Sequence, residues 1–581
     1  MGDLVIVSNR GPFSFSQDLL DHAQRHLEEG EELEPPPFGQ GGLVQAMSGL
    51  LRPGPWRTTW LGASMGDRDV DVARGHYRSL FRRMAEQGIA PKQFPHIELD
   101  PDNRMHFQYG EYDFFMRFVF FDTRHMHSYY SRFANGFLWP LLHLTRAPLF
   151  YKKCRGFPRP EFNKSDFVQY TSSGVTFANT ILDEIQKSGA LHRTGEETVI
   201  WNQDYHLMRV SETFKGLLEE ERVPAVSRRH IHMGQFIHTP LFNIHDIQGL
   251  IREDKRSRIK SDVYDPFAES IESVLKKLTW GMLHNDFIGF HTKEYCDNYL
   301  AALEEWFPVD IRMADKSYEI FWQGGVTTVG ALPIGLDVDK ILAEVGPGKT
   351  LRYRVNGKSL QKMIQEDKDA GCVVFGGLER RDYTKGLLER LRVFLHAYNR
   401  LSEGNRRARF YQASSPSRMS NPEYRHLHTL VADEVAKVNR RLPEEEPILH
   451  LDQGIPSPQN YRFMKAVDVM LVTPLEDGMN LVAFEYILSQ KHKEPGQRGL
   501  LALSTSGASR VLEGKGFGLE DGVVFINPLK PKEAGRKIAE AVENGCGLSG
   551  RLVAYVEEER RVDDWAEENI SAILNARPAS R

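Results

Sequence analysis

The stretch TPLEDGMNLVAFEY, residues 473–486, joins an acidic loop to an apolar helix that carries a single carboxylate. Asp477 lies in the loop, and Glu485 falls on the first or second turn of the helix that the pattern predicts. A carboxylate at that point can accept two hydrogen bonds from the vicinal hydroxyls of a ribose. Structural roles fit as well, because Asp477 could cap the helix and Glu485 could interact with its dipole.

Cationic side chains gather in a second stretch, where a predicted buried strand runs into the loop LERRDYTKG, residues 378–386. Arg380 and Lys385 at such a strand-to-helix turn are suited to holding a diphosphate. Arg418 also follows a predicted strand of the same sheet. Judged by the charge pattern alone, a solvated loop in which Asp382 pairs locally is the slightly better interpretation.

A glycine-rich stretch, GQGGLVQAM at residues 39–47, opens another predicted helix and includes Gly42. Glycines there let backbone N–H groups come close to an anion, and the helix N-terminus favours negative charge. A tight turn is nevertheless the commoner role of two glycines before a helix. Arg10 follows the first strand and adds a permanent charge suited to phosphate. Together with the cations described above, it indicates a substrate rich in phosphate.

Four further residues have types that suit a sugar. Asp204 and His238 each end a predicted strand, where an aspartate can accept from a sugar hydroxyl and a neutral histidine can donate to one. Tyr130 and Trp139 lie nine residues apart on one predicted helix. Taken one at a time, such residues are more often structural than ligand contacts.

The elements that must position these residues alternate between strands and helices almost throughout the chain. Such alternation predicts parallel sheets with helices on both faces, here as two doubly wound α/β domains with a hinge near residues 331–341. Ligands of these sheets bind beyond the carboxyl ends of the strands, so we expect the site in the cleft between the domains. The predicted strands are 3–8, 116–121, 197–202, 230–238, 286–290, 372–376, 408–412, 447–451, 468–473, 499–504 and 522–526, and the helices between them include 129–145 and 266–284.

Length and composition restrict the class of protein. A chain of 581 residues is too long for one hydrophobic core, and its net charge of −5 lacks the basic footprint of a nucleic-acid-binding protein. Four scattered cysteines, an N-terminus without a signal peptide, and the lack of any apolar run near 18 residues favour a cytoplasmic protein without a membrane partner. His-x-His and Asp-x-Asp pairs occur, but no third ligand falls at a persuasive spacing, so we expect no metal site.

Taken together, these motifs resemble the trehalose-6-phosphate synthase family, which consists of retaining glycosyltransferases of the GT-B fold, family 20. The matching pieces occur in the family's order and cover most of residues 4–530. They are VSNR, GGL, YYSRFANGFLWP, DYHL, FIHTP, DFIGFHT, LPIGLD, LERRDYTKGLLER, SPSR and VTPLEDGMNLVAFEY.

The resemblance implies a role for each candidate residue and for each part of the chain. The implied donor contacts are Arg380, Lys385, Gly42, Asn480 and Leu481 for the diphosphate, Glu485 for the ribose, and Asp477 and His238 for the transferred glucose. The implied acceptor contacts are Arg10, Arg418 and Tyr130 for the phosphate, and Trp139 and Asp204 for the sugar. Residues 1–331 would bind the acceptor, residues 332–553 the nucleotide sugar, and residues 554–581 would form a helix that crosses back to the first domain.

The implied reaction belongs to trehalose biosynthesis and moves glucose from a nucleoside-diphosphate glucose, UDP-glucose first, to glucose 6-phosphate. Asp477, His238, Arg380 and Lys385 would be its catalytic residues, without an enzymatic nucleophile, a cofactor or a divalent metal. The chain departs from the family's pattern at several points, which puts the acceptor's identity in doubt. These are the longer segment after Arg10, the run TPLFNIHDIQ after His238, Gln203 in place of a histidine, and Phe484 in place of a common lysine.

Three alternatives stay open at this level. A sister synthase would use another phosphorylated acceptor, such as glycerol 3-phosphate, and a GT-B phosphorylase would carry pyridoxal phosphate on a lysine. A non-catalytic sugar-phosphate sensor would be free to lose Asp477 and His238, so their presence favours an enzyme. The donor base and the oligomeric state, a homo-oligomer included, are not decided by the sequence.

Overall fold

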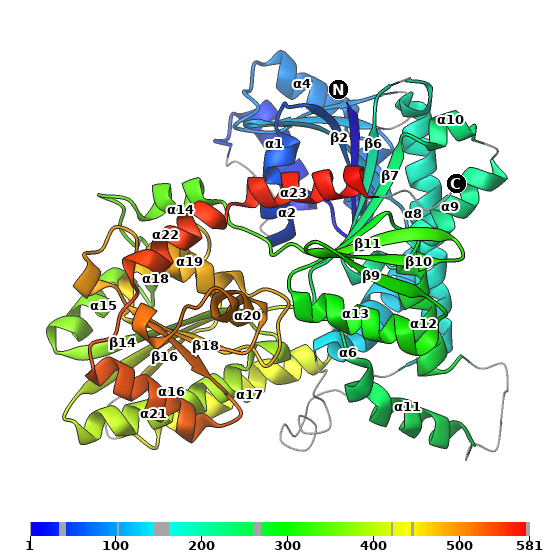
Figure 1. Cartoon of the computed structure of the whole chain (residues 1–581). Helices are drawn as coiled ribbons and strands as arrows, with labels where there is room; N and C mark the ends of the chain where they lie inside the picture. Colours follow the sequence, from blue (N-terminus) through cyan, green and yellow to red (C-terminus); the bar gives the residue numbers. More distant parts are fainter. Residues whose placement is uncertain are drawn as a thin grey trace. The chain divides into compact units, whose positions relative to one another are not determined.

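The computed structural model describes residues 2–33, 42–100, 104–143, 162–193, 195–221, 223–259, 269–419, 422–442 and 447–576. They form two compact units (Figure 1). Unit 1 comprises Met1–Leu141, Pro160–Leu332 and Asp563–Arg581, and most of unit 2 is Pro333–Val562. Within the described residues, none of the helices is long and apolar enough to cross a membrane.

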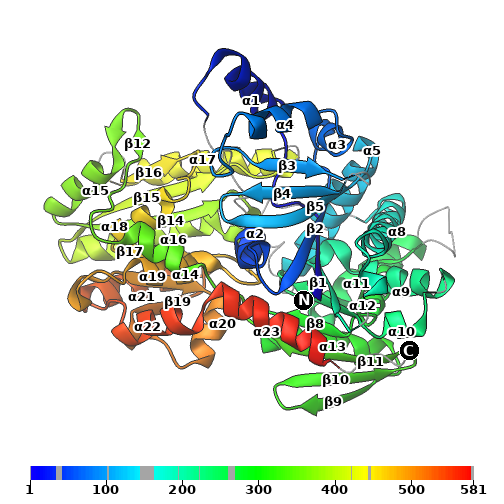
Figure 2. The same ribbon diagram turned by 90° about the horizontal axis from the view of Figure 1, so that it is seen from above.

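Unit 1 is built on an eleven-stranded sheet with the strand order β3-β4-β5-β2-β1-β6-β7-β8-β11-β10-β9. The strands from β5 to β11 in that order are parallel, and antiparallel pairs extend the sheet at both ends (Figure 2). The strand order reverses between β1 and β6, which makes the loops after these two strands the ligand-binding point of such a sheet. The strands are β1 Gly2–Ser8, β2 Trp56–Ala63, β3 His96–Leu99, β4 Met105–Tyr109, β5 Tyr112–Val119, β6 Thr198–Gln203, β7 Ile231–Ile237, β8 Phe287–Phe290, β9 Asp310–Ala314, β10 Ser317–Trp322 and β11 Gly325–Ala331.

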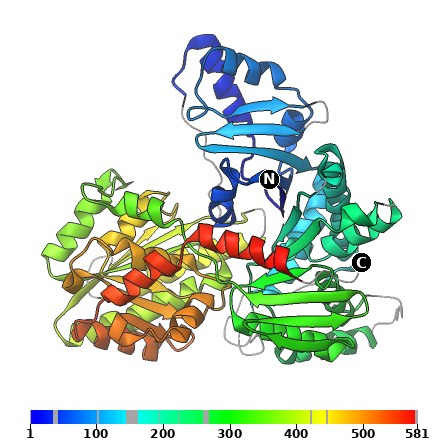
Figure 3. The same ribbon diagram turned by 45° about the horizontal axis from the view of Figure 1, so that its top comes forward.

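The helices of unit 1 follow the strands in the chain. A last helix, α23, drawn in red in Figure 3, returns to this unit from the end of the chain. Its Trp565 packs on Trp201 of β6 and Phe236 of β7. The helical elements are α1 Gln17–Glu29, α2 Gly42–Met47, η1 Ser48–Leu51, α3 Asp67–Ala73, α4 Arg78–Glu86, α5 Thr123–Met126, η2 His127–Leu138, α6 Trp139–His143, α8 Lys164–Lys187, η3 Ala190–His192, η4 Tyr205–Leu207, α9 Val210–Glu220, α10 Ala225–Arg228, α11 Ile244–Ile259, α12 Ile271–Met282, α13 Lys293–Trp306 and α23 Val562–Asn575.

Unit 2 contains a six-stranded, fully parallel sheet with the order β16-β15-β14-β17-β18-β19. Its order reverses between β14 and β17, as in a classical doubly wound sheet. The strands are β14 Cys372–Arg380, β15 Arg407–Ser415, β16 Ile448–Leu451, β17 Val469–Val472, β18 Leu500–Ser504 and β19 Val523–Ile526, and β12 Arg354–Val355 pairs separately with β13 Lys358–Ser359.

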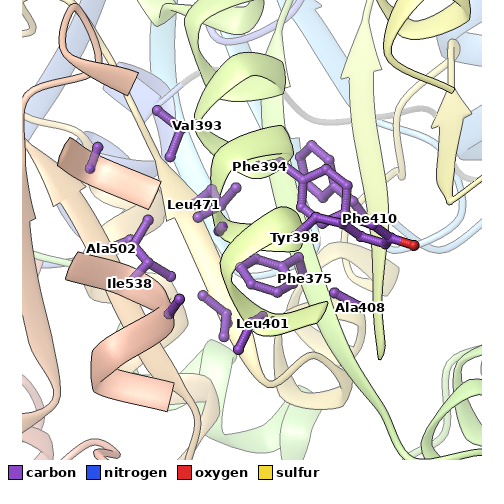
Figure 4. Packing of buried hydrophobic residues seen from close by; sticks show 14 of the residues in the cluster. Phe375, Val393, Phe394, Tyr398, Leu401, Ala408, Phe410, Leu471, Ala502 and Ile538 are labelled. Atoms are coloured by element: carbon purple, nitrogen blue, oxygen red, sulfur yellow. The ribbon is translucent and has the colours of Figure 1, made fainter. Parts of the chain in front are cut away.

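Helix α16 supplies much of the core of unit 2. Phe394 packs between Phe375 of β14 and Phe410 of β15, with ring centroids 5.3 and 5.0 Å away (Figure 4). The helical elements are α14 Val338–Val345, α15 Leu360–Asp369, η5 Tyr383–Lys385, α16 Leu387–Glu403, α17 Pro422–Asn439, α18 Gln459–Ala466, α19 Leu481–Ser489, η6 Pro495–Gln497, α20 Gly507–Gly514, η7 Leu519–Asp521, α21 Pro531–Glu543 and α22 Gly550–Glu559.

The predicted fold class is confirmed, and each predicted strand overlaps an observed one. Strands β2 and β11, the antiparallel strands β3, β4, β9 and β10, and the short pair of β12 and β13 were not predicted from the sequence. The prediction of a single helix over residues 554–581 is wrong, because α22 ends at Glu559 and α23 begins at Val562, with a break at Arg560. There Leu336 donates its backbone N–H to Arg560 at 2.7 Å and accepts from Val562 at 2.9 Å, so strand-like pairing replaces the helical hydrogen bonds.

The segment after Arg10 is held down by a buried acid. Asp69 has no exposed surface and accepts hydrogen bonds from the backbone N–H of Phe15 at 2.7 Å and of Met65 at 2.8 Å. Phe13 lies 5.2 Å from Phe107, so aromatic packing adds to this attachment. One of the Asp-x-Asp pairs therefore has a structural role. Residues 34–38 of the acidic, proline-rich segment lie outside the described residues.

Candidate functional site

The reversal point of unit 2 brings together two of the predicted site residues. The loop after β14 carries Lys385, and the loop after β17 carries Asp477. The Lys385 ammonium donates to the Asp477 carboxylate, although the two residues are 92 positions apart. Their side chains are only 11% and 10% exposed, so this is a buried ion pair.

Asn480 joins this pair to a third charged residue. It is the N-cap residue of α19, and its side-chain amide donates to Asp477 at 3.1 Å and to Glu379 at 2.7 Å. The interpretation of Asp477 as the helix cap is therefore wrong, because its carboxylate faces Lys385 and Asn480. Leu481 begins the helix immediately beyond.

Glu379 is a functional candidate that the sequence reasoning missed. It is buried, and its carboxylate lies 4.0 Å from the Lys385 ammonium and 3.9 Å from the guanidinium of Arg390. Arg390 donates to the Thr473 hydroxyl at 2.9 Å, and burial lowers its pKa to about 10. The signal that could have found Glu379 is a carboxylate beside Arg380 at the end of an apolar strand.

Burial and charge shift the pKa values of Lys385 and Glu485. Burial by itself lowers the pKa of Lys385, but the carboxylates of Asp477 and Glu379 outweigh it and raise that pKa. Burial raises the pKa of Glu485 to about 7, and the nearby Glu379 charge adds to the increase. Among the described residues, no side chain or backbone group hydrogen-bonds the Glu485 carboxylate. It is therefore available to accept from hydroxyl groups of a ligand.

Arg418 and Arg380 flank the same loop. Arg418 donates to the buried Asp382 carboxylate at 3.2 Å and to the Tyr424 hydroxyl at 2.5 Å. Burial tends to raise the pKa of Asp382, but Arg418, Arg380 and Lys385 together lower it. The interpretation as a solvated loop with local pairing is therefore wrong, because Asp382 has no exposed surface and its partner Arg418 is 36 positions away. Arg380 is 48% exposed, and its guanidinium lies 3.9 Å from the Asp382 carboxylate.

The reversal point of unit 1 gathers another group of predicted residues. Arg10, after β1, lies over the ring of Tyr130 at 5.4 Å, and Tyr130 stacks on His206 at 5.6 Å. The carboxylate of Asp204, after β6, accepts the backbone N–H of His238 at 3.2 Å. Four residues that are distant in sequence therefore share the carboxyl edge of this sheet.

Two predicted residues have less direct support. Trp139 is buried and packs 5.9 Å from the ring of Tyr205, which is the core position that such an aromatic residue more often has. Gly42 is the first residue of α2, and the rest of its glycine cluster lies outside the described residues. The acceptor role of Trp139 and the donor role of Gly42 stay predictions.

The paired histidines at the start of β7, His230 just before the strand and His232 within it, have a structural partner. His230 and His232 lie 3.1 and 2.8 Å from the two carboxylate oxygens of Glu197. Within the part of the chain that the structure describes, no group of three or more histidine, cysteine or acidic side chains is arranged to hold a metal ion.

Comparison with known proteins agrees with the fold and identifies the family of the chain. The family model described as Glycosyltransferase family 20 matches residues 4–249 and 260–575. The chain is 25% identical over 547 residues to the 56 kDa subunit of alpha,alpha-trehalose-phosphate synthase [UDP-forming] of Saccharomyces cerevisiae, with 93% of this chain and 87% of the relative covered. It is 27% identical over 564 residues to the synthase of Pichia angusta, with 96% of each chain covered.

Two solved structures show the same fold at low identity. One is the alpha,alpha-trehalose-phosphate synthase from Burkholderia xenovorans in complex with glucose-6-phosphate, with a TM-score of 0.66, 20% identity, and 99% of this chain and 100% of that chain covered. The other is described as trehalose-6-phosphate from E. coli bound with UDP-2-fluoro glucose, with a TM-score of 0.65, 19% identity and 99% of both chains covered. The likeness confirms the GT-B fold, with two Rossmann-like domains.

Proposed function

The chain belongs to glycosyltransferase family 20, and from that premise we propose that it transfers glucose from UDP-glucose to glucose 6-phosphate. The products are trehalose 6-phosphate and UDP, and the anomeric configuration is retained. The observation that carries this proposal is the buried cluster of Lys385, Asp477, Asn480 and Glu379 beside Glu485. Relatives over nearly the whole chain are UDP-forming trehalose-phosphate synthases, which supports the same reaction.

The donor is assigned to the residues of unit 2 and to two residues of unit 1. Arg380 and Lys385 neutralise the leaving diphosphate, which is the main electrostatic contribution in a mechanism without an enzymatic nucleophile. Lys385 already has two carboxylates close to it, so the exposed guanidinium of Arg380 supplies much of the charge that the diphosphate meets. The other donor contacts are Gly42 and the backbone at Asn480 and Leu481 for the diphosphate, Glu485 for the ribose, and Asp477 and His238 for the glucose.

The acceptor is assigned to Arg10, Tyr130 and Arg418, which bind its phosphate, and to Trp139 and Asp204, which hold its sugar. The contact between Arg10 and Tyr130 supports a shared role, because the ring orients a guanidinium that is otherwise exposed. In this proposal residues 1–331 bind the acceptor and residues 332–553 the nucleotide sugar. The last helix, α23, packs on the sheet of unit 1. A cytoplasmic location and a homo-oligomeric state stay predictions.

A product assay tests this function by crossing donors with acceptors. UDP-, GDP- and ADP-glucose are each incubated with glucose 6-phosphate, with glycerol 3-phosphate, and with no acceptor. Nucleoside diphosphate should be released only when a hexose 6-phosphate is present, together with a non-reducing phosphorylated disaccharide. Equal release with glycerol 3-phosphate would overturn the acceptor assignment. Lys385→Met is the matched inactive control, since it keeps the length of the side chain and removes the charge.

A further inference from the structure

The sequence places a glutamine before Asp204, where the family's pattern has a histidine, and the structure shows its partner. Gln203 is the last residue of β6 and has no exposed surface. Strand β7 runs parallel beside it and ends just before His238. The side-chain oxygen of Gln203 lies 3.0 Å from Nε2 of His238.

Other contacts hold the rest of His238 in place. Its backbone N–H donates to the Asp204 carboxylate at 3.2 Å. Asp204 has a φ of 71°, a conformation that a non-glycine residue keeps only when its surroundings hold it there. The imidazole packs against the rings of Phe236 at 4.7 Å, His291 at 5.4 Å and Trp565 at 5.9 Å. The ring of His238 is therefore oriented from several sides.

This arrangement distinguishes the two ring nitrogens of His238. Nε2 faces a carbonyl oxygen, so the proton of the neutral ring belongs on Nε2. Nδ1 has no hydrogen-bond partner among the described residues, and it carries the lone pair. Burial lowers the pKa of His238 to about 3, so the ring is neutral at physiological pH. The ionisable groups that face it from the packed elements are Asp204 and His291.

We propose that Gln203 is a positioning residue, which holds His238 with its proton on Nε2 and makes Nδ1 the acceptor for a hydroxyl of the transferred glucose. The identity of the ligand rests on the proposed function, whereas the contact between Gln203 and His238 does not. A glutamine does not titrate, so the contact keeps the same form across the working pH range. The sugar hydroxyl is then the donor, and the histidine does not donate to it.

Nitrogen NMR of the ligand-free protein tests the position of the proton. The protein is labelled with ¹⁵N-histidine, and His238→Asn identifies the signals of His238 by their loss. Nε2 should have the shift of a protonated ring nitrogen and Nδ1 that of an unprotonated one. A proton on Nδ1 would overturn the proposal. This result does not depend on any enzymatic activity, so it separates the inference from the proposed reaction.

Substitutions at Gln203 test its positioning role. Gln203→Glu places a negative charge beside Nε2 and should move the titration of His238 upward by at least about two pH units. Gln203→Leu removes the contact and should lower kcat about 10- to 100-fold, the range expected for a small misplacement of a reacting group, with the acceptor KM unchanged. Gln490 is a buried glutamine of unit 2, and Gln490→Glu controls for the general effect of a buried carboxylate. An unmoved titration in Gln203→Glu would contradict a direct contact.

Modified donors test which partner gives the proton to the hydrogen bond. UDP-glucose analogues with single hydroxyls replaced by hydrogen or by fluorine are compared as competing ligands. At the hydroxyl that His238 holds, both replacements should weaken binding equally, because neither hydrogen nor fluorine can donate a hydrogen bond. In His238→Asn, the analogues and unmodified UDP-glucose should bind with the same affinity. A fluoro analogue that binds several-fold better than its deoxy counterpart there would show that the histidine donates, and would refute the proposal.

Discussion

Replacing Asp477 with asparagine should destabilise the protein and tighten its hold on UDP at the same time. The substitution keeps the shape of the side chain and removes the charge that faces Lys385. Breaking a buried ion pair costs about 3–5 kcal/mol when the remaining charge has no partner. Here Lys385 keeps Glu379 at 4.0 Å, so we expect a smaller cost than that range, about 2–3 kcal/mol. That corresponds to a decrease in Tm of about 4–12 °C for a domain of this size.

The binding of UDP should change in the opposite direction. Without its glucose, UDP has no hydroxyl for Asp477 to accept from, and the carboxylate only repels the diphosphate. Two unit charges about 6 Å apart repel by about 3 kcal/mol at an effective dielectric constant of 20, before screening by salt. Asp477→Asn should therefore strengthen the binding of UDP by about 1 kcal/mol, which corresponds to a Kd about fivefold lower. Glucose transfer should fall about 100-fold or more, because the sugar loses a charged acceptor.

Urea denaturation and calorimetric titration with UDP measure the two effects on the same preparation. Asp369→Asn, an exposed carboxylate in the same unit, is the control and should change neither quantity. If Asp477→Asn weakened UDP binding several-fold, the carboxylate would be needed to place Lys385 rather than opposed to the diphosphate. A change in stability below about 0.5 kcal/mol would mean that the pair is not buried in solution.

Three further predictions concern single residues. The folded-state pKa of Glu485, about 7, lies above its ordinary 4.5, so the folded state holds the extra proton and stability should decrease as pH rises between these values. The decrease in stability should be about 3 kcal/mol, and urea denaturation at pH 5 and pH 8 would measure it. It should be absent in Glu485→Gln. If stability depended on pH in the same way in both proteins, the raised pKa would be contradicted. Arg418→Ala should raise the acceptor KM about tenfold with little change in the donor KM. Two-substrate kinetics would measure both constants, with Arg418→Lys as the comparison variant. The reverse pattern would move Arg418 to the donor side. Asp69→Ala leaves the N–H groups of Phe15 and Met65 without an acceptor and should cost about 2–4 kcal/mol in thermal or urea unfolding, whereas Asp69→Asn, which keeps one acceptor oxygen, should cost less.

The alternation of strands and helices was readable from the sequence because buried parallel strands are continuous apolar runs. Val469–Val472 and Leu500–Ser504 are examples, since each is fully buried and each is followed by a helix. The antiparallel additions to unit 1 were not readable. Strand β9, Asp310–Ala314, is largely exposed at a sheet edge, so it lacks the apolar pattern that marks a buried strand.

Most members of the candidate site were predictable from the sequence, with Glu379 as an exception, but the contacts between them were not. The pattern made Lys385, after a strand, and Glu485, on an early helical turn, candidate ligand contacts, because ligands bind at the carboxyl edge of a parallel sheet. The family resemblance added Asp477. Local pattern also allowed Asp477 to be a helix cap, and only the structure excluded that role. Helix capping is decided within a few residues, whereas the partner of Asp477 is 92 positions away.

By itself, the sequence determined the family, the doubly wound character of the sheets and the residues that carry charge at the ends of their strands. The tertiary structure alone decided which of these charges meet. It placed Asn480 between Asp477 and Glu379, Arg418 on Asp382, and Gln203 on His238. The physical reason is that strand order, not distance along the chain, sets which loops become neighbours. Burial then shifts the pKa of some of the groups that this order brings inside, raising that of Glu485 and lowering that of His238.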